Sequence, residues 1–369
     1  IRMCCNFKYV NSGTIDQPYC YPRIDDMIRN VSPYPFITKL DATSGYWQIG
    51  VREEDVYKTS FITNKGQYAW KVMPFGLRCC SSFFQRMVDK VLYPYRDFSS
   101  GYIDDITVVG LNFNEHVQNL DKVLTAFSDV GITFKLKKCE FAKPSVTLLG
   151  FQVGSGSISV LKDKIEAILN IPEPTTKKQV RSFLGMCNFY RSYIPNLSTT
   201  SSSLVELTTN NSKNKFVLNE SQRRSFLKLK SLLTETPVLV CPDYTKPFII
   251  HTDASDEGVG AVLQQQDEQG NLQPIAYSSK KFDSCQKKWS TIDKEAFSLI
   301  YSLENFEHII FGCRVIVYTD HNPLQYLSDI VPKSPKLSRW ALAIQKFNIK
   351  IHHIQGKQNL VADSLSRLL

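Results

Sequence analysis

With 369 residues and a formal net charge of +9 at pH 7, the chain is long enough for two or three domains, and its basic balance is consistent with a polyanionic partner such as nucleic acid. It contains no apolar run of about 18 residues and no basic leader before an apolar segment, so neither a membrane span nor a secretory signal is supported. Its 10 cysteines include no Cys-x-x-Cys spacing, which indicates reduced thiols of an intracellular protein.

The segment 1–35 predicts a strand over 2–10, then a polar loop and a proline-punctuated approach to an apolar run. That run ends in Asp41 and is followed by a polar turn that leads to Tyr46. Asp41 is either the N-cap of a turn or, if further carboxylates lie beside it, one ligand of a metal site.

Apolar residues recur at helical spacing after the Met-Pro-Phe-Gly turn that contains Phe75. Gln85 lies alongside this stripe. The pattern predicts an amphipathic helix that packs under a sheet with Phe83, Phe84, Met87, Val88 and Val91 near one face.

Two adjacent aspartates, Asp104 and Asp105, interrupt the strongly strand-forming run 101–109. Aspartate is depleted in strands and favoured in tight turns, so we expect a β-hairpin with the pair at or near its tip. The pair is either turn chemistry alone or two carboxylates held so close that divalent cations must relieve their repulsion. Together with Asp41, they could hold two metal ions that stabilise the attacking and leaving oxygens of a phosphoryl transfer.

The middle of the chain is predicted to be mainly helical. Asn219 and Gln222 have capping-box spacing at the start of one helix. We expect a helix near 115–130, a short hairpin over 148–153, and helices over 162–170, 176–193 and 219–234.

From residue 246 the pattern changes to alternating strands and helices, which predicts a separate α/β domain. Asp253 and Asp320 close strands, where turn chemistry explains them, and Asp363 lies in the first turn of a helix, where the dipole favours an acid. With Glu295 on a helix between them, the same acids would also suit a two-metal nuclease, because a sheet gathers distant positions into one cluster.

The helix that carries Glu295 is expected over 290–309. Glu295 falls beside its apolar stripe, where an unpaired charge is costly, so this carboxylate should meet a cation or a partner. The stripe consists of Ile292, Ala296, Leu299, Leu303 and Phe306.

These motifs follow one another in a fixed order: Leu40-Asp41 with Ser44-Gly45-Tyr46, Val72-Met73-Pro74-Phe75-Gly76-Leu77, Phe84-Gln85-Arg86, Tyr102-Ile103-Asp104-Asp105 and Leu148-Leu149-Gly150-Phe151. The order resembles the polymerase core of gypsy-type LTR retrotransposon reverse transcriptases. Further on, the surroundings of Asp253, Glu295, Asp320 and Asp363 resemble a retroelement RNase H domain. The resemblance therefore implies an α+β right-hand polymerase palm and thumb with truncated fingers, followed by an α/β RNase H-like domain.

The implied domains are partial fingers and palm over 1–160, thumb or connector helices over 161–245 and the RNase H-like domain over 246–369. The catalytic and metal-binding residues would be Asp41, Asp104 and Asp105 in the first and Asp253, Glu295, Asp320 and Asp363 in the last. Arg2, Tyr46, Phe75 and Gln85 would bind the nucleotide, with Tyr46 excluding a ribose 2′-OH. Leu149 and Gly150 would belong to the primer grip.

Two of these residue roles have simpler alternatives. Tyr46 is otherwise a core aromatic, and 148–153 an ordinary edge hairpin. The loop Cys79-Cys80-Ser81-Ser82 also departs from the Asn-Ala-Pro-Ala type of sequence common in the family.

The resemblance implies an RNA-directed DNA polymerase with ribonuclease H activity, which uses two Mg²⁺ ions, or Mn²⁺, in each active site. Its partners would be an RNA or DNA template-primer, an RNA–DNA hybrid and deoxynucleoside triphosphates, in a cytoplasmic particle or the nucleus. The alternative is a truncated or domesticated fragment that binds nucleic acid without polymerase activity, or that keeps only RNase H hydrolysis.

Overall fold

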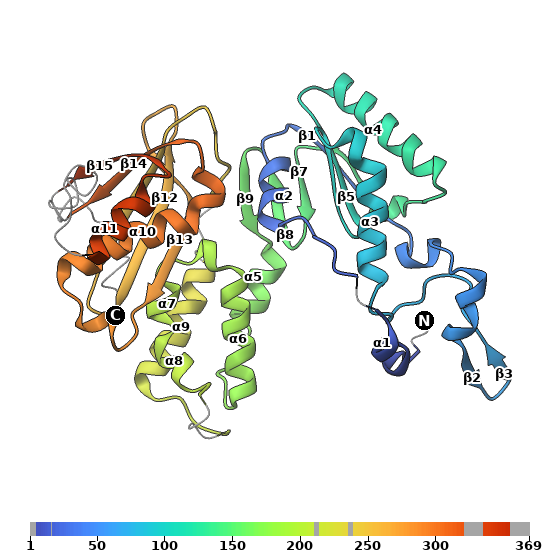
Figure 1. Cartoon of the computed structure of the whole chain (residues 1–369), viewed down its shortest axis with the longest axis horizontal. Helices are drawn as coiled ribbons and strands as arrows, with labels where there is room; N and C mark the ends of the chain where they lie inside the picture. Colours follow the sequence, from blue (N-terminus) through green and yellow to red (C-terminus); the bar gives the residue numbers. More distant parts are fainter. Residues whose placement is uncertain (1–4, 16, 210–213, 235–238, 321–334, 355–369) are drawn as a thin grey trace. The chain divides into compact units, whose positions relative to one another are not determined.

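The computed structural model describes residues 5–15, 17–209, 214–234, 239–320 and 335–354. Contacts within the chain divide it into two units, Ile1–Ile158 and Ser159–Leu369 (Figure 1). Among the described residues, no helix combines the length and apolar character that crossing a membrane requires. Arg2 and Asp363 lie outside the described residues.

The first unit is built from helices α1 (Lys8–Gly13), α2 (Ile24–Val31), α3 (Cys80–Leu92) and α4 (Phe113–Asp129), with strands β1 (Phe36–Asp41), β2 (Phe61–Thr63), β3 (Gly66–Tyr68), β4 (Ser99–Tyr102), β5 (Asp105–Gly110), β6 (Glu140–Lys143), β7 (Ser145–Leu148) and β8 (Phe151–Gly154). Two short 3-10 helices, η1 (Gly45–Gln48) and η2 (Glu53–Thr59), connect β1 to β2. The main sheet is antiparallel and has the strand order β4-β5-β1-β6. β2 pairs with β3 in a two-stranded sheet, and β7 forms a hairpin with β8.

Helices α3 and α4 pack on the main sheet through their apolar stripes. Phe84 and Val88 of α3 and Phe127 of α4 are fully buried in the same cluster as Ile106 of β5. The approach of α3 to β4 requires a glycine, since a Cβ added to Gly101 would lie 2.4 Å from Cγ1 of Val88. This packing fixes the end of the sheet at which strand β1 ends and strand β5 begins.

The second unit begins with a helical part, α5 (Lys162–Leu169), α6 (Lys177–Phe189), α7 (Leu197–Thr200), α8 (Ser202–Glu206) and α9 (Glu220–Thr234), and β9 (Ser157–Val160) lies at its boundary. The expected capping box is confirmed, since Asn219 Oδ1 accepts from the Gln222 N–H and the Asn219 N–H donates to Gln222 Oε1. Two basic residues of α9 are engaged within the unit: Arg223 pairs with Glu173, and Lys230 donates to the carbonyls of Leu169, which ends α5, and of Ile171.

The rest of the second unit contains β10 (Leu239–Val240), β11 (Phe248–Ala254), β12 (Gly258–Gln266), β13 (Leu272–Lys281), α10 (Thr291–Ile310), β14 (Arg314–Thr319), α11 (Pro335–Ile344) and β15 (Asn348–His353). Its sheet has the order β13-β12-β11-β14-β15, in which β14 runs parallel to both β11 and β15. Helix α10 packs on this sheet through a stripe of fully buried side chains that includes Leu299 and Phe306.

Three expectations about local structure are wrong. The described part of the segment 2–10 enters helix α1 rather than a strand, and α2 lies in the approach to β1 for which only a loop was expected. Phe83 and Ile292 are 44% and 42% exposed, so they lie outside the buried stripes to which they were assigned. The buried side of α3 already begins at Cys80 and continues through Phe84 and Val88, so Phe83 lies on another face of the helix.

Candidate active sites

The three acids predicted for the first unit, Asp41, Asp104 and Asp105, are called the front acids here. Two of them lie opposite each other in the main sheet. Asp41 ends β1, Asp105 begins β5, and the two are register partners in the antiparallel pair β1–β5. Directly opposite residues of such a pair project from the same face with Cβ atoms about 5 Å apart. The sheet register therefore brings these two carboxylates together although they are far apart in sequence.

The third acid stands in a strained turn. Tyr102 and Asp105 are paired, so Ile103 and Asp104 form the two-residue connection between β4 and β5. Ile103 has a φ of 54°, a left-handed conformation that a β-branched residue rarely adopts. The hairpin predicted for the Asp-Asp pair is confirmed, with Asp104 in its turn and Asp105 at the start of the returning strand.

Gln85 holds this turn from beneath. Its side chain is fully buried, and its Oε1 accepts from the Ile103 N–H at 2.7 Å. Its Nε2 donates to the Gly101 carbonyl at 2.9 Å and to Asp89 Oδ1 at 2.8 Å. The polar atoms of Gln85 are thus engaged with the protein beneath the hairpin, and the residue is not part of the pocket lining.

Replacing Gln85 with alanine is expected to destabilise the first unit by about 1–3 kcal/mol, because buried polar groups lose their partner. The strained Ile103 turn loses its support, so Asp104 beside it is expected to shift in the pocket lining. Thermal unfolding of the full chain and a crystal structure of the variant test this. The control is Gln118→Ala on the exposed side of α4, and equal behaviour of the two variants would show that the turn is held by other contacts.

Lysine amines neutralise two of the front carboxylates. Lys138 Nζ lies 3.0 Å from Asp41 Oδ2, and Lys39 Nζ lies 3.1 Å from Asp105 Oδ1. Lys39 also donates to the Thr147 carbonyl at 2.9 Å. Lys138 lines the pocket next to Asp41, so its amine stands where an anionic substrate would enter.

Burial raises the pKa of Asp105, and the neighbouring Asp104 and Asp41 raise it further against the opposing effect of Lys39. The folded chain thus keeps a proton on Asp105 at pH values where the unfolded chain, with an aspartate pKa of about 3.9, has lost it. Its contribution to the free energy of unfolding therefore falls as pH rises through this window.

Asp105→Asn removes this penalty, and we expect it to stabilise the metal-free first unit near pH 7 while leaving its stability near pH 3.5 unchanged. Thermal unfolding in a chelator at the two pH values measures the difference. Asp121→Asn, at an exposed position inside helix α4, is the control. A gain of equal size at both pH values would contradict the assigned cause.

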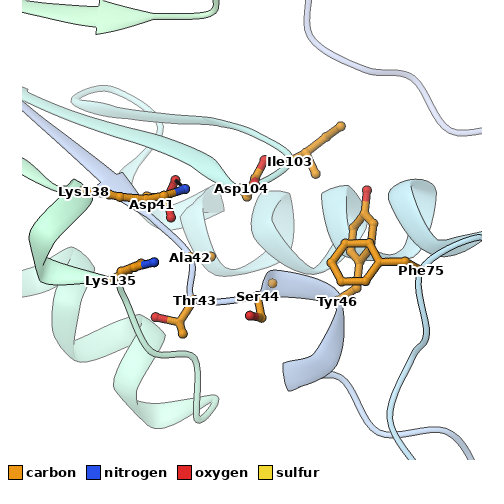
Figure 2. Close-up of a pocket in the computed structure, with 11 residues that line it drawn as sticks. Asp41, Ala42, Thr43, Ser44, Tyr46, Phe75, Ile103, Asp104, Lys135 and Lys138 are labelled. Carbon is orange, nitrogen blue, oxygen red and sulfur yellow. Dashed lines mark hydrogen bonds and ion pairs between the residues drawn. The ribbon is translucent and has the colours of Figure 1, made fainter. Parts of the chain in front are cut away.

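A pocket of about 310 Å³ opens over this edge of the sheet (Figure 2). Asp41, Asp104 and Lys138 lie on one side of it, and the rings of Tyr46 and Phe75 stand together on the other. The Tyr46 and Phe75 centroids are 5.2 Å apart. The pocket thus joins acids, a cation and an aromatic wall, which is a donor set suited to a divalent cation, a phosphate chain and a sugar.

The predicted hairpin near 148–153 is confirmed as β7–β8. Leu148 pairs with Phe151, so Leu149 and Gly150 form the two-residue turn, and their φ angles are 49° and 92°. Positive φ at both positions is typical of the type I′ hairpin turn, which suits Gly150 and strains Leu149.

Three of the four acids predicted for the second unit, Asp253, Glu295 and Asp320, lie among the described residues and converge on one point; we call them the rear acids. Asp253 lies near the end of β11, Asp320 directly follows β14, and the parallel pairing of these strands places both acids at the same sheet edge. Glu295 of α10 completes the group, and one ligand atom of each residue lies within 4.8 Å of the others. Asp253 and Glu295 are 2% and 4% exposed. Such a compact set of carboxylates fits a divalent cation.

Hydrogen bonds tie α10 to the strand end that carries the first rear acid. Ser298 Oγ donates to the Asp253 carbonyl at 3.0 Å, and Glu295 Oε1 accepts from the Ala254 N–H at 3.3 Å. The expectation that Glu295 meets a partner is therefore confirmed. His353 of β15 bonds through Nε2 to the Asp320 carbonyl at 3.0 Å, so this imidazole supports the backbone of a third acid.

Among the described residues, the rear acids form the group of acidic, thiol or imidazole side chains whose ligand atoms lie close enough together to hold a metal ion. Among the front carboxylates, Asp41 and Asp104 share a pocket, Asp41 and Asp105 share a register position, and lysine amines pair with Asp41 and Asp105. Sequence reasoning missed these lysines. The basic run from Lys135 to Lys138 was the available signal, but its proximity to Asp41 depends on contacts between distant segments.

Two family matches cover these sites. Residues 1–153 match the family described as "Reverse transcriptase (RNA-dependent DNA polymerase)", and residues 243–347 match the "RNase H-like domain found in reverse transcriptase". The chain is 36% identical over its whole length to the "Retrovirus-related Pol polyprotein from transposon opus" of Drosophila melanogaster, and 34% identical over 99% of its length to that from transposon gypsy. It spans 38% and 36% of the length of these two relatives.

Solved structures give the same fold. The foamy viral protease-reverse transcriptase dRH in complex with double-stranded DNA is similar with a TM-score of 0.84 and 23% identity, covering 96% of this chain and 62% of the other. The foamy viral protease-reverse transcriptase in complex with an RNA/DNA hybrid has a TM-score of 0.75 and 22% identity, covering 95% and 48%. The predicted fold class is confirmed, and the chain carries the reverse transcriptase and RNase H-like domains of a gypsy-type LTR retrotransposon Pol polyprotein.

Proposed function

We propose that this chain extends a DNA primer on an RNA or DNA template and cuts the RNA of an RNA–DNA hybrid. The observation that carries the proposal is that each unit holds its own group of acids at a sheet edge, Asp41, Asp104 and Asp105 in the first and Asp253, Glu295 and Asp320 in the second. The second group would include Asp363. Because the two acid groups are separate, we assign primer extension to the first unit and RNA cleavage to the second.

In the first unit, the aromatic wall and the cation have distinct tasks. Tyr46 would stand against the sugar of the incoming deoxynucleoside triphosphate and exclude a 2′-OH, with Phe75 supporting its ring. Lys138 would leave Asp41 and bind the phosphate chain, which replaces one charge pair with another. Two Mg²⁺ ions, or Mn²⁺, bound by the acids of each unit would supply Lewis acidity that activates the attacking oxygen and stabilises the leaving one.

The remaining assignments follow the chain. The helices of 161–245 would form a thumb, and 246–369 the nuclease domain, with partial fingers and palm before them. Leu149 and Gly150 would place their turn backbone against the primer end, Arg2 would contact the triphosphate, and Gln85 would support the site through the turn. The foamy viral proteins solved with double-stranded DNA and with an RNA/DNA hybrid support a template-primer and a hybrid as partners.

The test uses an RNA template with a recessed DNA primer, labelled on both strands. With Mg²⁺ and the four deoxynucleotides, the full chain is expected to lengthen the primer and shorten the RNA, and a chelator should stop both reactions. Binding of this duplex without either reaction, compared at two salt concentrations, would contradict the proposal and favour a fragment that only binds nucleic acid. RNA cleavage without extension would leave hydrolysis as the sole activity.

A further inference from the structure

An unbroken series of aromatic ring contacts runs from an exposed hairpin towards the front pocket. At its outer end, Phe61 of β2 stacks on Tyr68 of β3 with centroids 5.9 Å apart and contacts Trp70 at 6.1 Å. Trp70 stacks on Trp47 at 6.0 Å with an interplanar angle of 30°. Trp47 in turn contacts Phe75 in a T-shaped arrangement with centroids 5.5 Å apart.

The inner end of the series is the pocket wall itself. Phe75 contacts Tyr46 at 5.2 Å, and Tyr46 contacts the fully buried Phe84 of α3 at 5.7 Å. Phe75 and Tyr46 both line the pocket beside Asp104. Trp47 also directly follows Tyr46 in η1, so the indole and the pocket tyrosine share one short backbone segment.

The hairpin β2–β3 depends on these rings for its position. None of its residues is buried, and Ile62 at its outer face is 81% exposed, so it has no core of its own. The backbone at its base is fixed, since the Met73 N–H donates to the Ile49 carbonyl and the Trp70 N–H donates to Thr59 Oγ1, both at 2.8 Å. Beyond that base, ring contacts orient the hairpin.

We infer that Trp70 is a positioning residue for nucleotide selection, which acts through its stack on Trp47 to hold Tyr46 and Phe75 in place. The inference rests on the proposed polymerase function and assigns a role to a residue outside the pocket. Aromatic side chains have few rotatable bonds, so two packed rings hold each other in place, and a shift of one ring displaces the other. Exclusion of a single hydroxyl depends on the wall holding its position to within a fraction of that group's width.

Removing the Trp70 ring leaves a cavity on one side of Trp47. The groups in contact with this ring are Trp47, Phe61 and Cys5 Sγ, which accepts from Trp70 Nε1 at 3.5 Å. They relax only partly into such a space, and a shift of Trp47 reaches Phe75 through their ring contact. The backbone bond from Trp70 to Thr59 does not involve the ring, so a side-chain substitution leaves the base of the hairpin intact. The expected consequence is a looser sugar site with the acids unmoved.

The experiment measures single-nucleotide addition of dTTP and of 5-methyl-UTP, which differ only in the ribose 2′-OH, by the full chain on one primer-template. Trp70→Ala is compared with Trp70→Phe, which keeps a ring, and with Tyr57→Ala, an exposed residue of η2 outside the ring series. We expect Trp70→Ala to lower the ratio of kcat/KM for the deoxynucleotide to that for the ribonucleotide by about ten-fold, mainly by raising the KM for dTTP. Trp70→Phe should keep this ratio within about two-fold of the wild-type value. If alanine prevents folding, Trp70→Leu keeps most of the volume without the stack.

RNA cleavage by the second unit is measured in parallel as a folding control and should stay unchanged. If the wild type extends the primer but Trp70→Ala matches Tyr57→Ala, the inference alone is overturned. The same holds if Trp70→Ala slows both nucleotides equally, since that is a structural effect without selection. If the wild type adds no nucleotide, the proposed function fails and the inference fails with it.

Discussion

Asp104→Asn is expected to abolish primer extension, with a loss of at least about a hundred-fold, while RNA cleavage in a hybrid continues at the wild-type rate. Asp104 faces the front pocket from the turn between β4 and β5. Asparagine keeps the shape and the capacity to accept a hydrogen bond but removes the charge that a divalent cation requires. Extension of a primer on a DNA template, where no RNA is cut, measures the loss.

The matched control is Asp121→Asn on the exposed side of α4, which should extend primers like the wild type. Thermal unfolding of the Asp104 variant should be unchanged or improved, because one of three neighbouring negative charges is removed. Substantial extension by a folded Asp104→Asn chain would exclude this carboxylate from the reaction.

Glu295→Gln is expected to have the reverse effect, with RNA cleavage lost by at least about a hundred-fold and extension retained. Glu295 is buried and converges with Asp253 and Asp320. Glutamine can still accept the hydrogen bond from the Ala254 N–H, so the helix should keep its place while the charge for metal binding is lost.

Glu304→Gln, on the exposed side of the same helix, provides the control. A preformed hybrid without deoxynucleotides isolates cleavage from synthesis. Loss of cleavage in the Glu304 variant as well would indicate damage to α10 rather than to the acid group, and full cleavage by Glu295→Gln would remove the rear group from the chemistry.

The strands that carry the acids were predictable because their cause is local. An aspartate pair within a run of Tyr, Ile, Thr and Val favours a hairpin turn, because aspartate is depleted in strands and common in turns. The hairpin β4–β5 forms at this position. Glu295 was also predictable, since a carboxylate beside an apolar helix stripe demands a partner. The alternation of strands and helices after residue 246 likewise indicated a separate sheet.

The missed features depend on contacts between distant segments. Lys138 reaches Asp41 across 97 residues, and no local pattern indicates that pair. Gln85 supports Ile103 from a neighbouring helix, and the positive φ of Ile103 is visible only once the hairpin closes. Helix α1 was missed because β-propensity near the chain start outweighed a short helix that no buried stripe marks.

The proposal gives each unit its own acid group and its own reaction, so the two reactions must be separable. One measurement tests it most directly: a single RNA template with a recessed DNA primer, labelled on both strands, is given to wild type, Asp104→Asn and Glu295→Gln under identical conditions. We expect a crossed result, in which Asp104→Asn only shortens the RNA and Glu295→Gln only lengthens the primer. Parallel loss of both products in either variant would contradict it.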